Sequence, residues 1–242
     1  MNKNIPGDLI FKAREICLKS LPQSDCHLHT SWTDGKSSVN EVYNKAVSSG
    51  LDTILFSEHS RKTSLDWFGK FVNEVRQLPT LPCKAYVGTE VKVETIAGDI
   101  DTIPEISSQC DFLMASVHRF IDKNNKTIQF LDTDPNLAVQ IEFDLTWAVL
   151  SNTKVDILGH MFGMSYKRFN KIPPDDMIKA LIKRASNFGI AVEINSHYHP
   201  NALRMIEWCK QFDANICFGS NAHTLHEVGM IMNQLRQEIE CQ

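Results

Sequence analysis

Histidine and acidic side chains recur at the ends of the strand-like segments of this chain. His27 and His29 lie two residues apart, and the alternation of a strand places both side chains on one face. Later strand-like segments end with, or are closely followed by, further histidine and glutamate residues and two asparagines: His59, Glu90, His118, His160, Glu193, Asn195, Asn221 and His223. Imidazole and carboxylate together are the ligands of zinc, manganese and iron sites. A lone histidine after a strand is usually structural, but their recurrence at strand after strand predicts a metal site.

Other polar residues near these positions have two interpretations. Asp34 either supplies an oxygen ligand or begins a turn before Gly35. His197 and His199 lie in a loop near the predicted site, and they face either substrate or solvent. We expect His226 to be exposed in the first turn of the last helix.

The segments that must position these residues alternate between strand-like and helix-like patterns. Seven short, mostly apolar runs predict strands: one ending at 27–29, then 52–57, 85–90, 112–117, 155–159, 190–195 and 215–219. Helices are predicted between them, one from the capping box Ser38–Glu41 to Gly50 and another from Pro173 to Gly189. Two more begin near Pro200 and Glu227, whereas residues 121–133 resemble an exposed polar loop.

This alternation predicts parallel strands, an α/β class and a small closed or nearly closed barrel, with an open doubly wound sheet as the alternative. In a parallel barrel the carboxyl ends of all strands open onto one rim. The histidines and Glu90 would therefore converge there from separate strands, although they are far apart in the sequence.

Composition narrows the range of functions. The chain has 242 residues, 43% of them hydrophobic, and a net charge of -4, so no broad basic field points to nucleic acid as a partner. No segment is long and apolar enough to span a membrane. The seven cysteines are scattered without a C-x-x-C pair, which is typical of free thiols in a reducing cytoplasm. We expect residues 1–23 to form an amphipathic helix packed on a single domain of residues 24–242.

Several of these segments also match the motifs of a known family. Asp25-Cys-His27-Leu-His29-Thr-Ser-Trp-Thr-Asp34-Gly35 resembles the opening motif of the PHP (polymerase and histidinol phosphatase) superfamily. Five shorter segments resemble its later motifs, in the same order: Ser57-Glu58-His59, Gly88-Thr-Glu90, Ser116-Val-His118, Gly159-His160 and Gly219-Ser-Asn221-Ala-His223. Two positions depart from the pattern, because Met161 replaces a proline and Asn221 replaces an aspartate.

The resemblance implies a distorted (β/α)7 TIM-like barrel with two or three divalent ions (zinc, manganese or iron) at its rim. One ion would be held by His27, His29, Glu90 and Asn221, a second by Glu90, His118 and His160, and a third by Asp34, His59 and His223. At Asn221 a neutral amide oxygen would replace an anionic ligand. The expected consequence is a weaker first metal site, a more electrophilic cluster, or a site with two ions in place of three.

The implied activity is hydrolysis of a small phosphomonoester by metal-activated hydroxide, similar to that of histidinol phosphatases. Glu90 would bridge two ions, and Arg119 would contact the phosphate, with Arg61, Lys62 and Arg168 as further candidates. The leaving group would take its proton from His197, from His199 or from water. The alternatives are a phosphodiesterase or exonuclease, a protein-phosphotyrosine phosphatase, and a non-catalytic metal-binding protein of the same fold.

Overall fold

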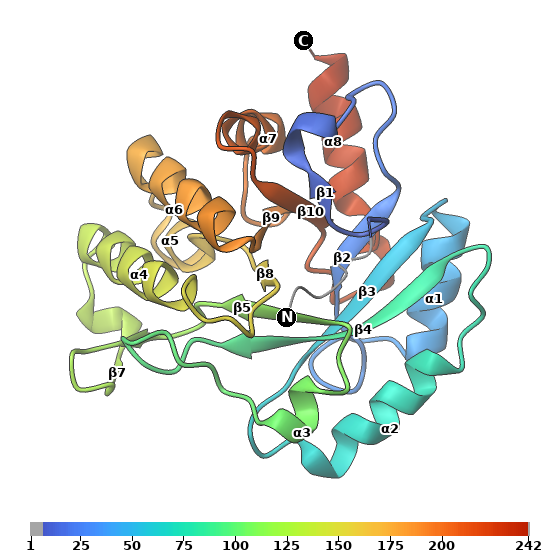
Figure 1. Ribbon diagram of the computed structural model, residues 1–242, viewed down its shortest axis with the longest axis horizontal. Coiled ribbons are helices and arrows are strands. Elements are labelled where there is room, and N and C mark those ends of the chain that lie inside the picture. Colours follow the sequence, from blue (N-terminus) through green and yellow to red (C-terminus); the bar gives the residue numbers. More distant parts are fainter. Residues whose placement is uncertain (1–6, 242) are drawn as a thin grey trace.

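A curled sheet occupies the centre of the molecule, and the helices lie outside it (Figure 1). The computed structural model describes residues 7–241, except for the side chain of Asp132. The strand order is β1-β10-β9-β8-β5-β4-β3-β2, and every neighbouring pair is parallel except β1 with β10. The two sides of the sheet approach each other at the bridge between Leu28 and Ala222, beside the predicted site.

The seven parallel strands are the seven that the sequence predicts. They are β2 (Ser24–Leu28), β3 (Thr53–His59), β4 (Lys84–Lys92), β5 (Phe112–Ser116), β8 (Ile157–Leu158), β9 (Ala191–Asn195) and β10 (Asn215–Gly219). The predicted α/β class, single domain and distorted (β/α)7 barrel are thereby confirmed.

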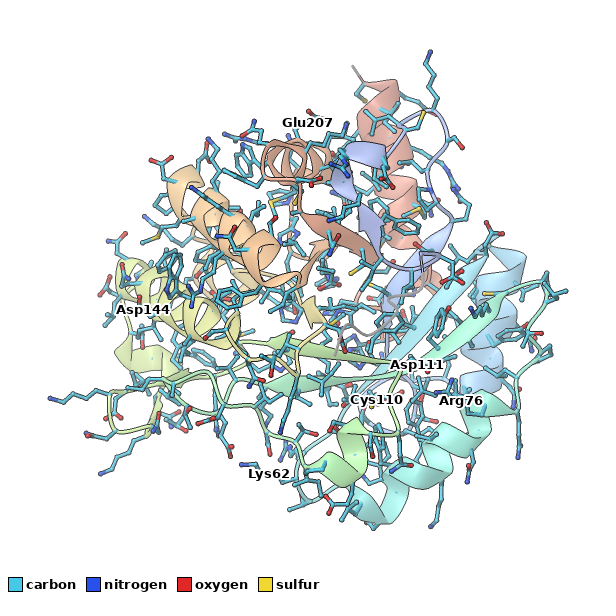
Figure 2. The ribbon with its side chains drawn as sticks, in the orientation of Figure 1. Lys62, Arg76, Cys110, Asp111, Asp144 and Glu207 are labelled. Carbon is cyan, nitrogen blue, oxygen red and sulfur yellow. The ribbon has the colours of Figure 1, made fainter. Side chains whose placement is uncertain are left out.

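The helices are α1 (Val39–Ser48), α2 (Leu65–Arg76), α3 (Pro104–Ser107), α4 (Pro135–Val149), α5 (Gly163–Phe169), α6 (Asp175–Phe188), α7 (Ala202–Gln211) and α8 (Met230–Glu240). The capping box at Ser38 begins α1, and α6 ends at Gly189 in the left-handed conformation (φ 71°), as predicted. Outward-facing charges pair across elements, as Arg76 of α2 does with Asp111 at 2.7 Å (Figure 2).

The interior contains two apolar clusters. The larger one lies between the sheet and the helices. The smaller one is formed mainly by inward-facing strand residues: Leu9, Ile10, Cys26, Leu55, Tyr86, Phe112, Met114, Ile157, Ala191 and Cys217. Each fully buried aliphatic or aromatic side chain stabilises the fold by roughly 1.5–3 kcal/mol. The cluster therefore stabilises the part of the barrel that lies beneath the polar rim.

The prediction of an amphipathic helix over residues 1–23 is wrong for the described part, residues 7–23. This segment contains the short strand β1 (Phe11–Lys12) and a 3-10 turn, η1 (Ala13–Glu15). Leu9 and Ile10 are buried in the inner cluster, and β1 pairs antiparallel with β10, which satisfies backbone groups at that edge of the sheet. Residues 1–6 lie outside the described part of the chain.

The expected polar loop at 121–133 is partly ordered. It begins in a hairpin of β6 (Phe120–Ile121) and β7 (Thr127–Ile128), which is followed by the 3-10 turn η2 (Phe130–Asp132). A further 3-10 turn, η3 (Leu225–Glu227), precedes α8 and contains His226. No helix within residues 7–241 has the length and apolarity to cross a membrane.

Candidate metal centre

The strand ends carry the predicted ligands to one rim. His27 lies within β2 and His29 directly follows it, while His59 ends β3 and is paired in register with Glu90 of β4. His118, His160 and Asn221 each follow their strand by two residues. Convergence of these side chains thus follows from the parallel topology.

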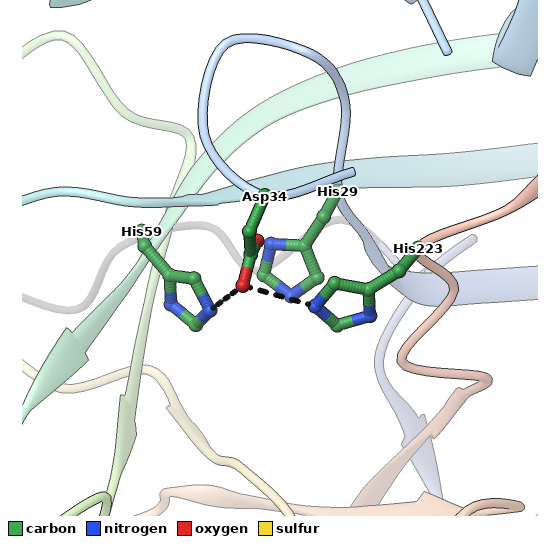
Figure 3. A group of neighbouring side chains, drawn as sticks. All are labelled: His29, Asp34, His59 and His223. Carbon is green, nitrogen blue, oxygen red and sulfur yellow. Dashed lines mark ion pairs between the residues drawn. The ribbon is translucent and has the colours of Figure 1, made fainter. Parts of the chain in front are cut away.

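One group of ligand-type residues surrounds the Asp34 carboxylate (Figure 3). Asp34 Oδ2 lies 3.4 Å from Nε2 of both His59 and His223, and His29 completes a set whose ligand atoms all lie within 4.8 Å of one another. The loop can bring Asp34 there because Gly35 passes close to the chain: a Cβ at Gly35 would lie 2.4 Å from the carbonyl oxygen of His29.

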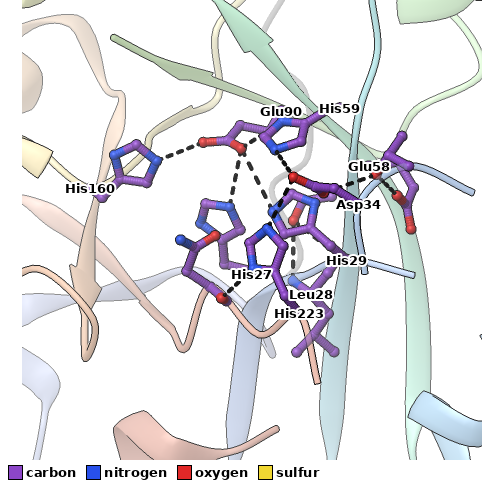
Figure 4. Close-up of polar contacts among 12 residues, drawn as sticks. His27, Leu28, His29, Asp34, Glu58, His59, Glu90, His160 and His223 are labelled. Carbon is purple, nitrogen blue, oxygen red and sulfur yellow. Dashed lines mark hydrogen bonds and ion pairs between the residues drawn. The ribbon is translucent and has the colours of Figure 1, made fainter. Parts of the chain in front are cut away.

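A second group surrounds Glu90, which is completely buried (Figure 4). Its Oε2 lies 3.0 Å from Nδ1 of His59, 3.4 Å from Nε2 of His27 and 3.7 Å from Nε2 of His29. Its Oε1 lies 2.8 Å from Nε2 of His160 and 3.1 Å from Nε2 of His118. Five imidazoles thus face one carboxylate, and His59 reaches both this group and Asp34.

The Glu90 group fits divalent cations. Both carboxylate oxygens of Glu90 and Nε2 of His27 and His29 are buried, and among the described residues none of them makes a hydrogen bond of good geometry, although they lie close to one another. Such atoms are costly to bury unless something binds them. Burial alone would raise the pKa of Glu90, but His118, His27 and His59 hold it well below its usual range, so the carboxylate is ionised and can act as a ligand.

Several imidazoles are held in a definite orientation by groups behind them. His27 Nδ1 donates to Glu193 Oε1 at 2.8 Å, which leaves Nε2 to face Glu90. His223 Nδ1 donates to the carbonyl oxygen of Asn221 at 2.9 Å, which leaves Nε2 to face Asp34. Partners of this kind fix the tautomer of a metal-binding histidine. The sequence places Glu193 on the sixth predicted strand but assigns it no such role.

Two motif carboxylates do not face the cluster. Asp25 accepts hydrogen bonds from the amides of Ser220 and Gly229, and burial raises its pKa to about 6. Glu58 accepts from the amide of Thr30, and burial raises its pKa to about 7. Both carboxylates therefore brace the loops that carry the ligands.

A pocket of about 350 Å³ opens above the two groups. Its wall includes expected ligands together with four basic residues: Arg61, Lys92, Lys167 and Arg168. Tyr198 also lines it, a residue that no motif in the sequence predicts at the site. Lys92 is half-buried, and its pKa is lowered mainly by burial and further by the positive charge of Arg61.

Asn221 is buried in the pocket wall, in the left-handed conformation (φ 49°) that asparagine tolerates well. Its amide nitrogen donates to the Tyr198 hydroxyl at 3.3 Å. This contact leaves the amide oxygen as the atom that can coordinate an ion.

The other residues predicted to contact substrate, Arg119, His197 and His199, are not among the residues that line the pocket. Arg119 is absent from the pocket wall, and its Nη2 donates to the carbonyl oxygen of Glu94 at 3.5 Å. His197 is exposed, and burial of part of its ring together with Lys167 lowers its pKa. His199 is buried and bonded on both ring nitrogens, to the amide of Asn195 and to the carbonyl oxygen of Met161, so its contacts are structural.

Comparison with known proteins places this architecture in a family. The PHP domain model matches residues 25–197. A protein of Aeromonas hydrophila named "Probable phosphatase" is 24% identical over 85% of this chain and 80% of its own length. A "Probable phosphatase" of Thermoanaerobacter sp. strain X514 is 26% identical over 88% and 83%.

A crystal structure with the same fold is that of histidinol phosphate phosphatase from Lactococcus lactis, complexed with zinc, L-histidinol and phosphate. Its TM-score is 0.64 at 17% identity, over 89% of this chain and 94% of that one. Because the family model covers more than half of the sequence, the chain belongs to the PHP domain family.

Proposed function

We propose that this protein is a metal-dependent phosphoesterase that hydrolyses a small phosphomonoester. The observation that carries the proposal is the convergence of five imidazoles on the buried carboxylate of Glu90, beneath a pocket with four basic residues. The names of the curated relatives and the phosphate-bound structural neighbour agree with this class of reaction.

The donor set suits two or three divalent ions, zinc, manganese or iron. His27, His29, Glu90, His118 and His160 would hold two of them, with Asn221 as a neutral oxygen ligand, and Asp34, His59 and His223 would hold a third. Bound ions would neutralise phosphate oxygens and lower the pKa of water at the site.

The chain itself orients the substrate. Arg61 and Lys92, on the side of the pocket next to His59 and Glu90, can bind the non-bridging phosphate oxygens. Burial raises the pKa of Tyr198, so its hydroxyl keeps its proton and can donate a hydrogen bond to the ester. Arg119 and His197 remain candidates for phosphate contact and proton donation, to be tested by substitution.

The proposal extends to the setting in which the protein works. Free thiols throughout the described chain agree with a reducing cytoplasm. A small phosphorylated molecule, in place of a nucleic acid, agrees with the negative net charge and with a pocket of about 350 Å³.

The test is a hydrolysis screen of the protein loaded in turn with zinc, manganese and iron. The panel contains 4-nitrophenyl phosphate, sugar phosphates, histidinol phosphate, phosphotyrosine peptides, bis(4-nitrophenyl) phosphate and a dinucleotide. We expect monoester turnover that Glu90→Gln lowers by more than about a hundredfold together with metal content, because an anionic ligand is lost. The matched control, Glu105→Gln, changes an exposed glutamate of α3 and leaves both unchanged.

Three outcomes would contradict the proposal. A preference for diesters would favour the phosphodiesterase or exonuclease alternative, and a preference for the peptides would favour the phosphotyrosine phosphatase. Metal binding without any turnover would favour a non-catalytic protein.

A further inference from the structure

The pocket above the metal centre continues past α5 into a second hollow. This hollow has a volume of about 570 Å³ and shares Met164, Lys167, Arg168 and Tyr198 with the pocket wall. A phosphate group at the cluster would therefore extend its leaving group across α5, along a surface that the chemistry of phosphate hydrolysis does not itself require.

The charges along this path are positive. Apart from the expected ligands, the charged residues described in the pocket wall are Arg61, Lys92, Lys167 and Arg168, and those described in the second hollow are Lys167 and Arg168. The chain as a whole carries a net charge of -4, so this gathering of cations does not reflect its composition.

These cations also lack acidic partners. Among the side chains that the structure describes, none of the four forms an ion pair with a carboxylate, whereas cations elsewhere do, including Lys62 with Glu94 and Arg76 with Asp111. The Arg168 guanidinium lies over the Phe130 ring at 4.5 Å, an arrangement that leaves the donors at its edge available. The Lys167 ammonium lies 3.4 Å from His197 Nε2.

The helix that carries Lys167 and Arg168 is held firmly against the metal centre. Glu142 of α4 accepts hydrogen bonds from the amides of Met164 and Ser165 at 3.0 and 2.8 Å, at the beginning of α5. Gly163 packs directly on a predicted ligand, since a Cβ there would lie 2.7 Å from His160 Nδ1. The two cations therefore have a defined position relative to the cluster.

The wall of the second hollow is otherwise largely apolar. Phe130, Leu131 and Phe169 line it, and the rings of Phe130 and Phe169 meet edge to face at 6.2 Å. Such a wall suits a flat or apolar body that carries a charged group within reach of the cations.

We infer that the substrate is a phosphomonoester whose leaving group carries a second anionic group, a carboxylate or another phosphate, bound by Lys167 and Arg168. The inference rests on the proposed function and narrows it. A leaving group with an ammonium group, such as that of histidinol phosphate, would face two unpaired cations and would be disfavoured.

The test compares aryl phosphates that differ only in the para substituent. Phenyl phosphate is the reference, 4-carboxyphenyl phosphate and 4-(phosphonomethyl)phenyl phosphate carry the two kinds of second anion, and 4-(aminomethyl)phenyl phosphate carries a cation. The readout is the ratio of each kcat/KM to that of phenyl phosphate, for the metal-loaded wild type and the double variant Lys167→Gln/Arg168→Gln. Lys171→Gln is the matched control, because Lys171 follows α5 but lines neither hollow.

We expect at least one of the two anionic esters to be preferred by about tenfold, and the aminomethyl ester to be disfavoured, because hydrogen bonds between charged groups are worth that much. The double variant should lose the preference and the control should keep it. Calorimetry with two non-hydrolysable analogues tests the same preference independently of turnover. If the carboxylate is the preferred anion, 4-carboxybenzylphosphonate should have a lower Kd than benzylphosphonate in the wild type, and the double variant should lose this difference.

Two results would overturn the inference. If phenyl phosphate is hydrolysed but the ratios equal one, or remain unchanged in the double variant, the second anion site is refuted and the phosphatase proposal stands. If none of the four esters is hydrolysed with any of the three metals but another monoester of the earlier panel is, the second anion site is refuted and the phosphatase proposal stands. If no monoester of either set is hydrolysed, both fail together.

Discussion

At the scale of single residues, the site depends on groups that never touch substrate. Glu193 is completely buried, and it accepts hydrogen bonds from His27 Nδ1 and from the side-chain amide (Nδ2) of Asn195. The Glu193 carboxylate can reach His27 because the residue beside it on β10 is a glycine. A Cβ at Gly219 would lie 2.0 Å from Glu193 Oε1.

Glu193→Gln should weaken metal binding by about 10–100-fold, because the neutral amide no longer holds His27 as a strong ligand. Dissociation constants from competition with a chelator measure the effect. Glu207→Gln, an exposed change on α7, should leave them unaltered. Equal affinities in Glu193→Gln and wild type would show that His27 does not bind an ion.

Asn221→Asp should tighten metal binding by about tenfold, since an anionic oxygen would replace a neutral one at the edge of the pocket. Metal content and turnover are the measurements, and Asn124→Asp in the exposed hairpin turn is the control. If metal content and turnover in Asn221→Asp match those of the wild type, Asn221 is not a ligand.

At the scale of elements, the seven-residue helix α5 positions Lys167 and Arg168 beside the metal centre. It has left-handed residues at both ends, Phe162 and Asn170, and is anchored by the buried carboxyl of Glu142. Burial raises the pKa of Glu142 to about 7, even though three hydrogen bonds from Met164 and Ser165 act in the opposite direction. Folding therefore favours the protonated form of this carboxyl over the ionised one.

The free energy of unfolding should reveal this anchor through its pH dependence. Because the folded pKa of Glu142 lies above its unfolded value, the contribution is fully present below pH ~4.3 and is lost as the pH rises through about 7. Across that pH window, the free energy of unfolding of the wild type should fall by up to about 3 kcal/mol relative to that of Glu142→Gln. Denaturant unfolding at several pH values measures it, with Glu105→Gln as the control; a constant difference would contradict the assignment.

At the scale of the whole molecule, the N-terminal segment contributes to the inner apolar cluster. Leu9 is fully buried in the inner cluster beneath the site, although it lies far in sequence from the strands that it packs against. The rim with its metal ligands is therefore supported by residues at the opposite end of the barrel.

Leu9→Ala should lower the free energy of unfolding by about 2–5 kcal/mol, the usual cost of a cavity in a close-packed core. Leu81→Ala, at a position 80% exposed, should cost less than about 0.5 kcal/mol. Chemical denaturation compares the two variants. Similar small losses in both would mean that the segment does not contribute to the core.

Much of the fold and of the ligand set could be predicted because both follow from local patterns. Apolar runs bounded by turn residues predict β2 to β5 and β8 to β10, and the histidines stand at their ends. The helix prediction for the N-terminal segment is wrong because the apolar spacing at Leu9, Ile10, Ala13 and Ile16 suits a helix, whereas pairing with the edge of β10 requires an extended chain. Edge pairing is a long-range interaction and leaves no local signal.

The sequence by itself determined the parallel α/β architecture, the family and the residues able to bind metal, since periodicity and motif spacing are properties of the chain alone. Only the tertiary structure decided that His59 faces both acidic groups and that Glu193 orients His27. It also decided that Lys167 and Arg168 line the pocket without forming an ion pair with a described carboxylate, with Arg168 lying over the Phe130 ring. These relations join residues from different strands and helices, and the direction in which a side chain points is set by the packing around it.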